Sequence, residues 1–181
     1  MVTHSKICCI SDIHVGVHQN SNQWHTITLD WAAWLSADLK SKGVEDIIIS
    51  GDFFHYRDEI AVNTIHFATE VLNLWRDFNM LVGNHDAYYK DRSDVNSLSI
   101  LAGWDNIRII SEIETHKILD KQVTFCPWGC NISDIPKSDI IFGHFEIQNF
   151  KQNSFKICST GIRSGDILDK SSLIISGHFH L

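Results

Sequence analysis

Short runs of apolar residues, bounded by polar ones, recur along the whole 181-residue chain. In the first half they alternate with two longer segments, 24–39 and 60–75, whose apolar residues recur at the spacing of a helix. The short runs predict buried strands at residues 6–11, 46–50, 79–82, 107–110, 117–119, 123–126, 139–142 and 172–175. Strand–helix alternation followed by a strand-rich half predicts a layered α/β fold whose second half adds another sheet. Neither a repeat nor a linker divides the chain, so we expect one domain over residues 1–181.

Composition narrows the class of protein. Apolar residues make up 44% of the chain, but their longest runs are too short to span a membrane. Residues 1–11 carry one Lys and no long apolar core, which is not the pattern of a secretory signal. The five cysteines are odd in number and show no disulfide-framework spacing, so we expect a reducing, cytoplasmic setting. Cys126 and Cys130 have no second pair of thiols, and ordinary packing is favoured there over a metal site.

The formal charge of −7 argues against a protein that holds nucleic acid by a basic surface alone. It does not exclude a protein that holds phosphate through bound cations, which formal charge does not count.

Polar residues directly follow five of the apolar runs. Sites in α/β sheets gather beyond the carboxyl ends of the strands, so we expect these residues to meet. Glycine precedes the polar residue in four of the five segments, where it permits a sharp turn and a close approach. The residues that this pattern brings forward are Asp12, His14, Asp52, Asn84, His85, Asp86, His144, His178 and His180.

This inventory points to metal binding. In an extended segment residues i and i+2 face the same way, so Asp12 with His14, and His178 with His180, would each offer two ligands, with Phe179 directed into the core. The ligands are too many for one zinc ion and suit two cations that share a carboxylate. Imidazole and oxygen ligands without thiolate favour Mn²⁺ or Fe²⁺, with Zn²⁺ as an alternative. A single His or Asp after a strand is usually a cap or a hydrogen-bonded core group, but five in series are hard to explain by chance.

The segments DIH, GD, GNHD, GH and GHFH, in this order, resemble the calcineurin-like metallophosphoesterases, whose fold is a layered α/β/β/α sandwich. The resemblance covers nearly the whole chain. It implies one metal held by Asp12, His14 and His180, a second held by Asn84, His144 and His178, and Asp52 between them. It also implies that His85 faces the scissile phosphate and protonates the leaving oxygen, and that Asp86 orients His85.

A narrower resemblance rests on residues 51–57, GDFFHYR, which are similar to the SbcD-type DNA repair nucleases. In that group the His matching His55 helps to position DNA; an ordinary helix-cap or surface histidine is the alternative. Pro127-Trp128 and residues 143–146 look most like the recombination endonuclease subunit of tailed phages, which would place the protein in the host cytoplasm.

The same resemblance bears on the end of the chain. In these nucleases the GHxH motif lies in mid-chain, before further strands, a DNA-capping region and helices that dock on an SbcC-type ABC ATPase. We therefore expect a C-terminally incomplete sandwich, truncated after the last metal-binding motif. The family also forms homodimers through helices of this domain. For the helices that carry Trp24, Trp31, Trp34 and Trp75, burial against the sheet is the favoured interpretation.

The resulting hypothesis is a dimetal phosphodiesterase that hydrolyses DNA, as an exonuclease or endonuclease subunit in recombination and double-strand-break repair. The alternatives are a phosphatase or cyclic-nucleotide phosphodiesterase of the same superfamily, or an inactive binding remnant. Residues 147–165 contain no Asp or Glu and carry Phe150 and Phe155, which suits DNA as well as a solvated hairpin. The candidate DNA contacts are Arg57, Lys90, Arg92, Lys151 and Lys156.

Overall fold

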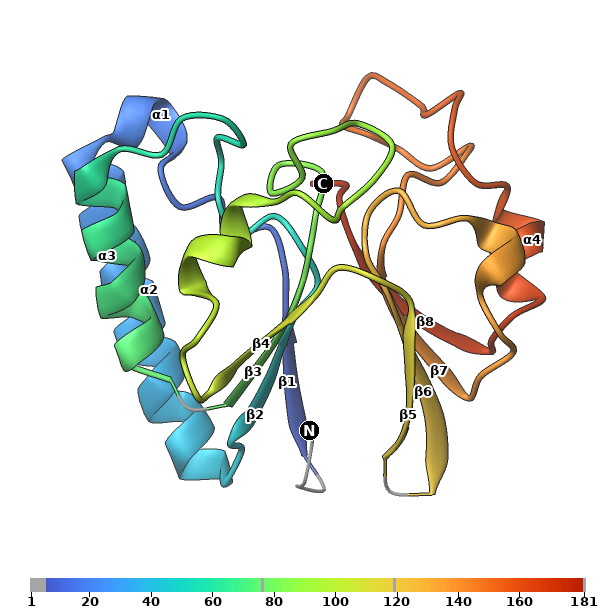
Figure 1. Cartoon of the computed structure of the whole chain (residues 1–181), viewed down its shortest axis with the longest axis horizontal. Coiled ribbons are helices and arrows are strands. Elements are labelled where there is room, and N and C mark those ends of the chain that lie inside the picture. Colours follow the sequence, from blue (N-terminus) through green and yellow to red (C-terminus); the bar gives the residue numbers. More distant parts are fainter. Residues whose placement is uncertain (1–5, 76, 119, 181) are drawn as a thin grey trace.

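The computed structural model describes residues 6–75, 77–118 and 120–180, which form two four-stranded sheets that face each other (Figure 1). The first sheet contains, in chain order and all in parallel, β1 (Ile7–Ile10), β2 (Asp46–Ile49), β3 (Asp77–Leu81) and β4 (Ile107–Ile110). The second contains β5 (Glu114–Ile118), β6 (Lys121–Cys126), β7 (Ile140–His144) and β8 (Leu173–Gly177). Only its β5–β6 pair is antiparallel among these described strands. The predicted α/β fold with a second sheet is confirmed.

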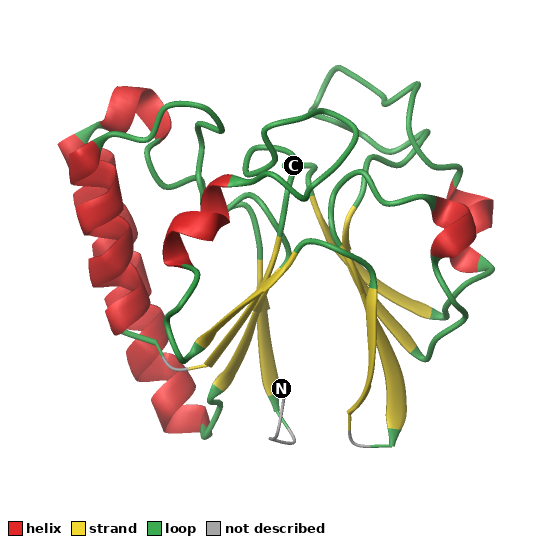
Figure 2. Ribbon diagram, in the orientation of Figure 1, coloured by secondary structure: helices red, strands yellow, loops and turns green. Residues whose placement is uncertain are grey.

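Helices complete the layers (Figure 2). The one-turn α1 (Val17–Asn20) leads into α2 (Asn22–Lys42), which packs with α3 (Val62–Asn73) on the outer face of the first sheet. The second sheet has the short α4 (Ser164–Leu168) beside its outer face. Two 3₁₀ turns, η1 (Ser97–Leu101) and η2 (Ile132–Asp134), lie in connections. The layers follow the expected α/β/β/α order, with a much thinner helical layer over the second sheet. No helix within the described residues is long and apolar enough to cross a membrane.

Most predicted elements shift by only one or two residues. Two differ by three residues: α2 ends at Lys42 and not at residue 39, and β5, expected at residues 117–119, runs over Glu114–Ile118, while residue 119 lies outside the described residues. The side chains of β5 alternate between half-buried and exposed positions, as is usual for a strand with one solvated face. A search for continuous apolar runs misses such a strand because its charged residues interrupt the pattern.

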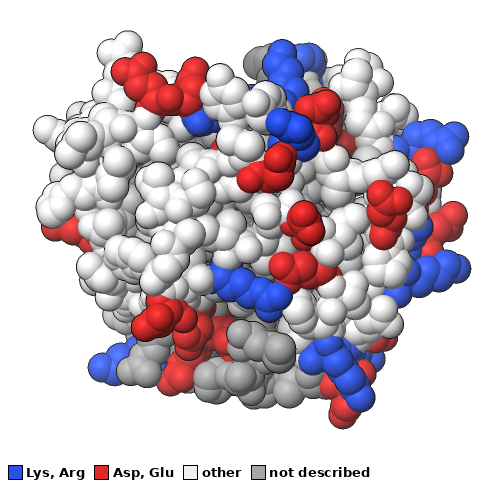
Figure 3. Space-filling model, viewed as in Figure 1, with Lys and Arg blue, Asp and Glu red and all other residues white. Residues whose placement is uncertain are grey.

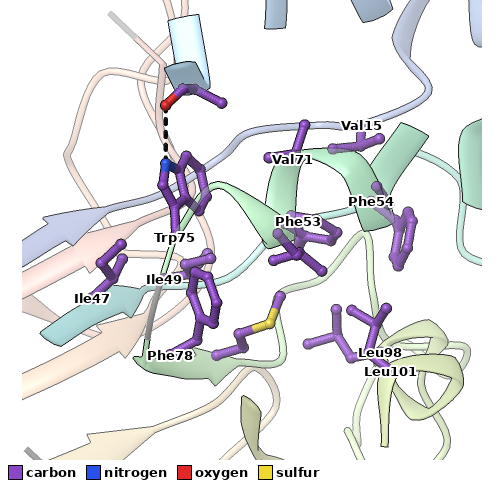
Figure 4. Packing of buried hydrophobic residues seen from close by; sticks show 14 of the residues in the cluster. Val15, Ile47, Ile49, Phe53, Phe54, Val71, Trp75, Phe78, Leu98 and Leu101 are labelled. Atoms are coloured by element: carbon purple, nitrogen blue, oxygen red, sulfur yellow. Dashed lines mark hydrogen bonds between the residues drawn. The ribbon is translucent and has the colours of Figure 1, made fainter. Parts of the chain in front are cut away.

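The strand β2 explains how one short run of isoleucines supports three layers. Successive side chains of a strand point to opposite faces. Ile47 and Ile49 pack with Phe53, Val71 and other residues of the core under the helices (Figure 4), whereas Ile48 joins the core between the two sheets. All three side chains are at most 1% exposed. This strand is therefore covered on both sides, and the segment that follows it emerges in the middle of the molecule.

Two of the three tryptophans of α2 are a correction to the expected burial, whereas Trp31 packs against the core under the helices and Trp75 is buried in it. Trp24 and Trp34 are 41% and 62% exposed, and Ile27 is 47% exposed. The buried stripe of the helix runs instead through His25, Ala32, Leu35 and Leu39. At the small Ala32 the two helical segments come close, and the Trp75 indole N–H donates to the Ala32 carbonyl at 3.1 Å. With about 3.6 residues per turn, Trp24 lies beside this stripe, whereas Ile27 and Trp34 lie on the far side of the helix from Ala32. An apolar arc this wide cannot face the sheet over its whole width.

Candidate metal centre

The polar segments that follow β1, β2, β3, β7 and β8 meet at one edge of the molecule. Figure 1 shows the loops of both sheets and the C-terminal residues gathered above the carboxyl ends of the strands. There they enclose an open pocket of about 500 Å³, whose lining includes His14, Asp52, Asn84, His85 and His180. The expected convergence at the carboxyl edge is therefore what the structure has.

Four of the candidate ligands form one cluster, here called the buried group: Asp52, Asn84, His144 and His178. The Asn84 side-chain oxygen lies 3.0 Å from His144 Nε2 and 2.7 Å from His178 Nδ1. His144 Nε2 lies 3.3 Å from Asp52 Oδ2. The donor atoms thus come from four different strand ends, yet they share one small volume.

The His144 ring is fixed by the main chain. Its Nδ1 lies 2.7 Å from the Ser50 carbonyl oxygen, which can only accept, so Nδ1 carries the proton and donates it. In the neutral ring Nε2 then presents its lone pair to the oxygens of Asp52 and Asn84, and in the protonated ring it donates to Asp52. The hydrogen bond from Nδ1 is typical of a metal-binding histidine, because it sets the tautomer and the ring orientation. Burial lowers the pKa of His144, but its hydrogen bond with Asp52 and that carboxylate's charge outweigh burial and raise it.

The remaining candidates form the open group: Asp12, His14 and His180. His180 Nε2 lies 2.9 Å from Asp12 Oδ1 and 3.3 Å from His14 Nε2. The main-chain N–H of His178 donates to both Asp12 oxygens at 3.2 Å, so the last motif is tied to the first. Burial lowers the pKa of His14 to about 4, against the raising effect of Asp52, which keeps the imidazole in the neutral form that binds metals.

Asp52 lies between the two groups. Its Oδ2 is 3.3 Å from His144 Nε2 in the buried group and 3.8 Å from His14 Nε2 in the open group. Its Oδ1 accepts the main-chain N–H of His85 at 2.8 Å. Burial alone would raise the pKa of Asp52, but the hydrogen bond and charge of His144 and the His85 amide lower it to about 2. The carboxylate is thus held ionised where both groups can reach it.

The backbone at the ligands is not extended, which corrects the i, i+2 argument. Asp12, His14 and Asp52 have φ of 56°, 52° and 54°, and His178 has φ of 105°. These left-handed conformations are costly for residues with side chains, and they accumulate at functional sites when the surrounding structure enforces them. His14 Nε2 and Asp12 Oδ1 still lie 4.0 Å apart, so the two side chains come together. Phe179 packs against the outer core of the second sheet as expected.

Two of the predicted glycines make room for these side chains. Gly51 has φ of 98°, and a Cβ there would lie 2.2 Å from the His144 ring. A Cβ on Gly83 would lie 2.2 Å from Asp52 Oδ1. These two glycines thus allow the main chain to approach the side chains of His144 and Asp52 closely.

His85 lies beside both groups, but its support differs from the expected one. Its Nδ1 lies 2.7 Å from the main-chain oxygen of His55, which must accept, so Nδ1–H is the donor and Nε2 remains available. The ring stacks on His55 with centroids 5.2 Å apart and meets His14 edge-on at 4.7 Å. His14, His55 and His85 therefore form a third cluster of imidazoles at the pocket.

Asp86 was expected to orient His85, but in the structure its carboxylate bonds to main-chain groups of other residues. The fully buried Asp86 carboxylate accepts main-chain N–H groups of Phe53, Phe54 and Gly83, at 3.3, 2.9 and 3.0 Å. Burial and the charge of Asp52 raise its pKa to about 6, against the lowering effect of the Phe54 and Gly83 amides. Asp86 thus ties the segment after β2 to the segment after β3, because its carboxylate points away from the pocket into main-chain donors.

The donor chemistry fits two divalent cations. Among the described residues, three sets of side-chain nitrogens and carboxylate oxygens lie within 4.8 Å of one another, and two of them are the predicted ligand sets without Asn84. In the buried group, His144 Nε2, the Asp52 carboxylate and the Asn84 oxygen are all acceptors aimed at the same point. Acceptors that face one another in this way repel unless a proton or a cation lies between them.

The candidate DNA contacts differ in exposure, and none of them is among the residues that line the pocket. Lys90, Lys151 and Lys156 are exposed, and Arg57 is half-buried. Arg92 lies 3.2 Å from Asp94 and stacks over the Tyr89 ring, so it is already engaged. On the face shown in Figure 3, the described Lys and Arg side chains lie among Asp and Glu and form no continuous basic stripe.

Residues outside the predicted ligand motifs also shape the site, among them Trp128 of the Pro127-Trp128 segment. Gln152 and Asn153, from the segment between β7 and α4, line the pocket with the candidate ligands. The Trp128 ring lies 5.1 Å from the His178 ring and is held by its main-chain N–H to Val82 and its indole N–H to Lys90, both at 2.8 Å. The only signal in the sequence for Gln152 and Asn153 was the absence of acidic residues around them.

The cysteines lie apart from the candidate ligands within the described residues. All five are unbridged, and Cys126 belongs to the core beyond the second sheet, with Cys130 packed against it. Neither belongs to a cluster of potential metal ligands among the described residues.

The sequence and structure of the chain were compared with those of known proteins. Residues 5–181 match the family described as calcineurin-like phosphoesterase. The chain is 28% identical over 188 residues to exonuclease subunit 1 of Enterobacteria phage T4, which covers 97% of this chain and 55% of that protein. It thus spans about half the length of this curated relative. A protein of unknown function from Aquifex aeolicus, AQ665, aligns with a TM-score of 0.45 at 14% identity, over 97% of this chain and 79% of the other. The chain belongs to the calcineurin-like phosphoesterases.

Proposed function

We propose that this protein hydrolyses phosphodiester bonds of DNA with two divalent cations, as the nuclease subunit of a recombination or repair complex. The observation that carries the proposal is the single Asp52 carboxylate between two sets of ligands, with His85 at their side. The name of the phage relative, an exonuclease subunit, supports DNA as the substrate and a multi-subunit assembly.

In this proposal Asp12, His14 and His180 hold one cation, and Asn84, His144 and His178 hold the other, with Asp52 shared. When bound, the cations supply an activated water and neutralise charge on the phosphoryl oxygens. Mn²⁺ is the proposed metal, because the ligands are imidazoles and hard oxygens without thiolate. The shared, ionised Asp52 contributes negative charge to both positions, which stabilises two cations at short range.

His85 is the proposed general acid. Its Nδ1–H is committed to the His55 carbonyl, so Nε2 is the nitrogen that can carry a proton into the pocket. The stacked His55 ring limits how His85 can turn and lines the pocket beside it, where it can position the DNA strand. Arg57, Lys90, Lys151 and Lys156 are the proposed phosphate contacts, and Arg92 would first have to leave Asp94.

The remaining parts of the proposal concern the whole protein. A nuclease subunit of this kind would act with an SbcC-type ATPase, in the host cytoplasm, and would dimerise through helices. The exposed Trp24, Ile27 and Trp34 of α2 supply an apolar surface that suits such a contact.

The decisive experiment combines metal analysis with substrates of different size. We expect about two Mn²⁺ per purified chain and Mn²⁺-dependent cleavage of single-stranded and duplex DNA, abolished by EDTA. His85→Ala should lower turnover by roughly 100- to 10,000-fold without loss of metal. His66→Ala is the matched control, because it removes an exposed imidazole of α3 that lies outside the pocket, and it should leave turnover and metal content unchanged. Cleavage of bis-p-nitrophenyl phosphate without any cleavage of DNA would instead identify a small-substrate phosphodiesterase, and full activity of His85→Ala would refute the acid assignment.

A further inference from the structure

The segment between β7 and α4 forms a hairpin whose tip, the 149–157 loop, reaches the metal centre. Its base is fixed by main-chain bonds between Asn149 and Cys158 and between Cys158 and Phe150, both at 2.8 Å. Lys151 and Ile157 pair across it, and the Gln152 N–H donates to the Lys156 carbonyl at 2.8 Å. Figure 1 shows this part of the chain rising above the carboxyl ends of the second sheet. The loop is thus an ordered projection at the rim of the site.

The tip of this loop faces the pocket with amide side chains. Gln152 and Asn153 line the pocket together with His14, His85 and His180. Asn153 Oδ1 accepts the main-chain N–H groups of Phe155 and Lys156 at 2.9 Å, which folds the tip and leaves the Asn153 NH₂ group to donate to a ligand. These amides can bind a nucleotide that occupies the metal centre.

Phe155 lies two residues beyond Asn153 and is 99% exposed. Other phenylalanines of this chain, such as Phe53, Phe54 and Phe78, are at most 2% exposed. A single exposed apolar residue needs no explanation. This one, however, belongs to the loop whose Gln152 and Asn153 line the pocket, and it lies in sequence between Lys151 and the adjacent Lys156, in a stretch with no acidic residue. An aromatic ring flanked by cations is the arrangement that proteins use to stack a base and hold its phosphates.

We propose that the 149–157 loop clamps an unpaired nucleotide next to the scissile phosphate, with a base stacked on Phe155 and a neighbouring phosphate held by Lys151 or Lys156. This inference rests on the proposed function and deepens it by naming the substrate class, which is single-stranded DNA or a frayed duplex end. Bases within a duplex are already stacked on both faces, so the Phe155 ring can bind a base only where the stack is open.

The test uses the intact chain and two labelled oligonucleotides of equal length, one of thymidines and one with abasic sites at the same positions. Binding is measured by fluorescence anisotropy without divalent metal, and cleavage is measured separately with Mn²⁺. We expect the wild type to bind the thymidine strand about 5-fold or more tightly than the abasic strand, from stacking of one base. Phe155→Ala should lose this preference, and Phe155→Trp should keep it. Val62→Ala is the control, since Val62 is 83% exposed on α3, outside the pocket.

The outcomes separate the two proposals. If the wild type cleaves DNA but treats both strands alike, or if Phe155→Ala keeps the preference, the clamp is refuted and the proposed function stands. If the wild type binds the thymidine strand preferentially through Phe155 but cleaves neither strand, the clamp stands and the nuclease proposal fails.

Discussion

The buried and open groups of the candidate metal centre are built from the same kinds of residues but are held very differently. In the buried group, the side chains of Asp52 and His144 are 2% and 0% exposed, and a main-chain carbonyl fixes the His144 ring. In the open group, the His180 side chain is 58% exposed, and its contacts are with the other members of the group, Asp12 and His14. The fold therefore fixes Asp52 and His144 before any metal binds, whereas His180 of the open group is positioned largely by Asp12 and His14.

This difference has a physical consequence for metal binding. Ligands that are already immobile lose little conformational freedom on binding, and a buried site strengthens the attraction between cation and carboxylate. An exposed histidine loses rotamer freedom when it coordinates, and its site is better screened by water. We therefore expect the two cations to bind with unequal affinity, the buried group filling first.

The largest effect should follow from a change at the carboxylate that the two groups share. In Asp52→Asn the side chain keeps its size, and asparagine tolerates the left-handed backbone at this position. Because the amide carries no charge, both metals should be lost and Mn²⁺-dependent activity should become undetectable. Metal content by elemental analysis and the rate of DNA cleavage check this expectation.

The matched control is Asp166→Asn, since Asp166 is a carboxylate that pairs with Arg163 on the surface, outside the metal centre. If Asp52→Asn retained one metal per chain with partial activity, the two groups would bind metal independently. The claim that both depend on the Asp52 carboxylate would then be wrong.

Some features of this site follow from the position of a residue in the sequence, and others depend on contacts between distant segments. Only the first kind can be predicted from the sequence. The ligands could be predicted because Asp12, Asp52 and His144 each follow an apolar strand, and parallel strands bring their ends to one edge. Their left-handed backbone could not be predicted, because non-glycine residues adopt it only when tertiary contacts enforce it. The Asp12 N–H to Gly51 carbonyl bond and the His14 N–H to Asp52 carbonyl bond, both 3.1 Å, join segments far apart in the chain.

Asp86 and the exposed tryptophans of α2 are two further features that could not be predicted from the sequence alone. A GNHD motif brings Asp86 forward as a polar residue beside a histidine, but the structure decides which donors its carboxylate meets. Trp24 and Trp34 fit a helical apolar pattern, yet which part of a wide apolar arc faces the sheet depends on where a small residue, here Ala32, allows close packing. Periodicity predicts the helix and leaves its rotation about its own axis undetermined.

The second prediction compares one histidine from each group. His144→Ala should remove the tighter Mn²⁺ site. Because it removes a fully buried ring and its hydrogen bond to the Ser50 carbonyl, which then keeps only the Ser11 hydroxyl as donor among the described residues, it should also destabilise the metal-free chain by about 1–3 kcal/mol. His180→Ala should weaken only the second equivalent, by roughly 10- to 100-fold, with the melting temperature of the metal-free chain unchanged. Calorimetric Mn²⁺ titration and thermal unfolding in EDTA measure the two effects. Equal losses of affinity and equal melting temperatures in the two variants would contradict the unequal support inferred from burial.

The smallest effect on turnover should come from Asp86→Asn, which should act mainly on the stability of the fold. Its carboxylate accepts three main-chain N–H groups behind the buried group, and the asparagine amide offers one oxygen and a donor in place of two oxygens. At least one buried N–H is left unpaired, which should cost about 1–3 kcal/mol in the free energy of unfolding, measured by urea denaturation. Turnover per folded molecule should change little, because the His55 carbonyl still holds His85. Strongly reduced turnover with unchanged stability would contradict this expectation. It would show that Asp86 orients His85 and that the buried group does not depend on the hydrogen bonds of Asp86.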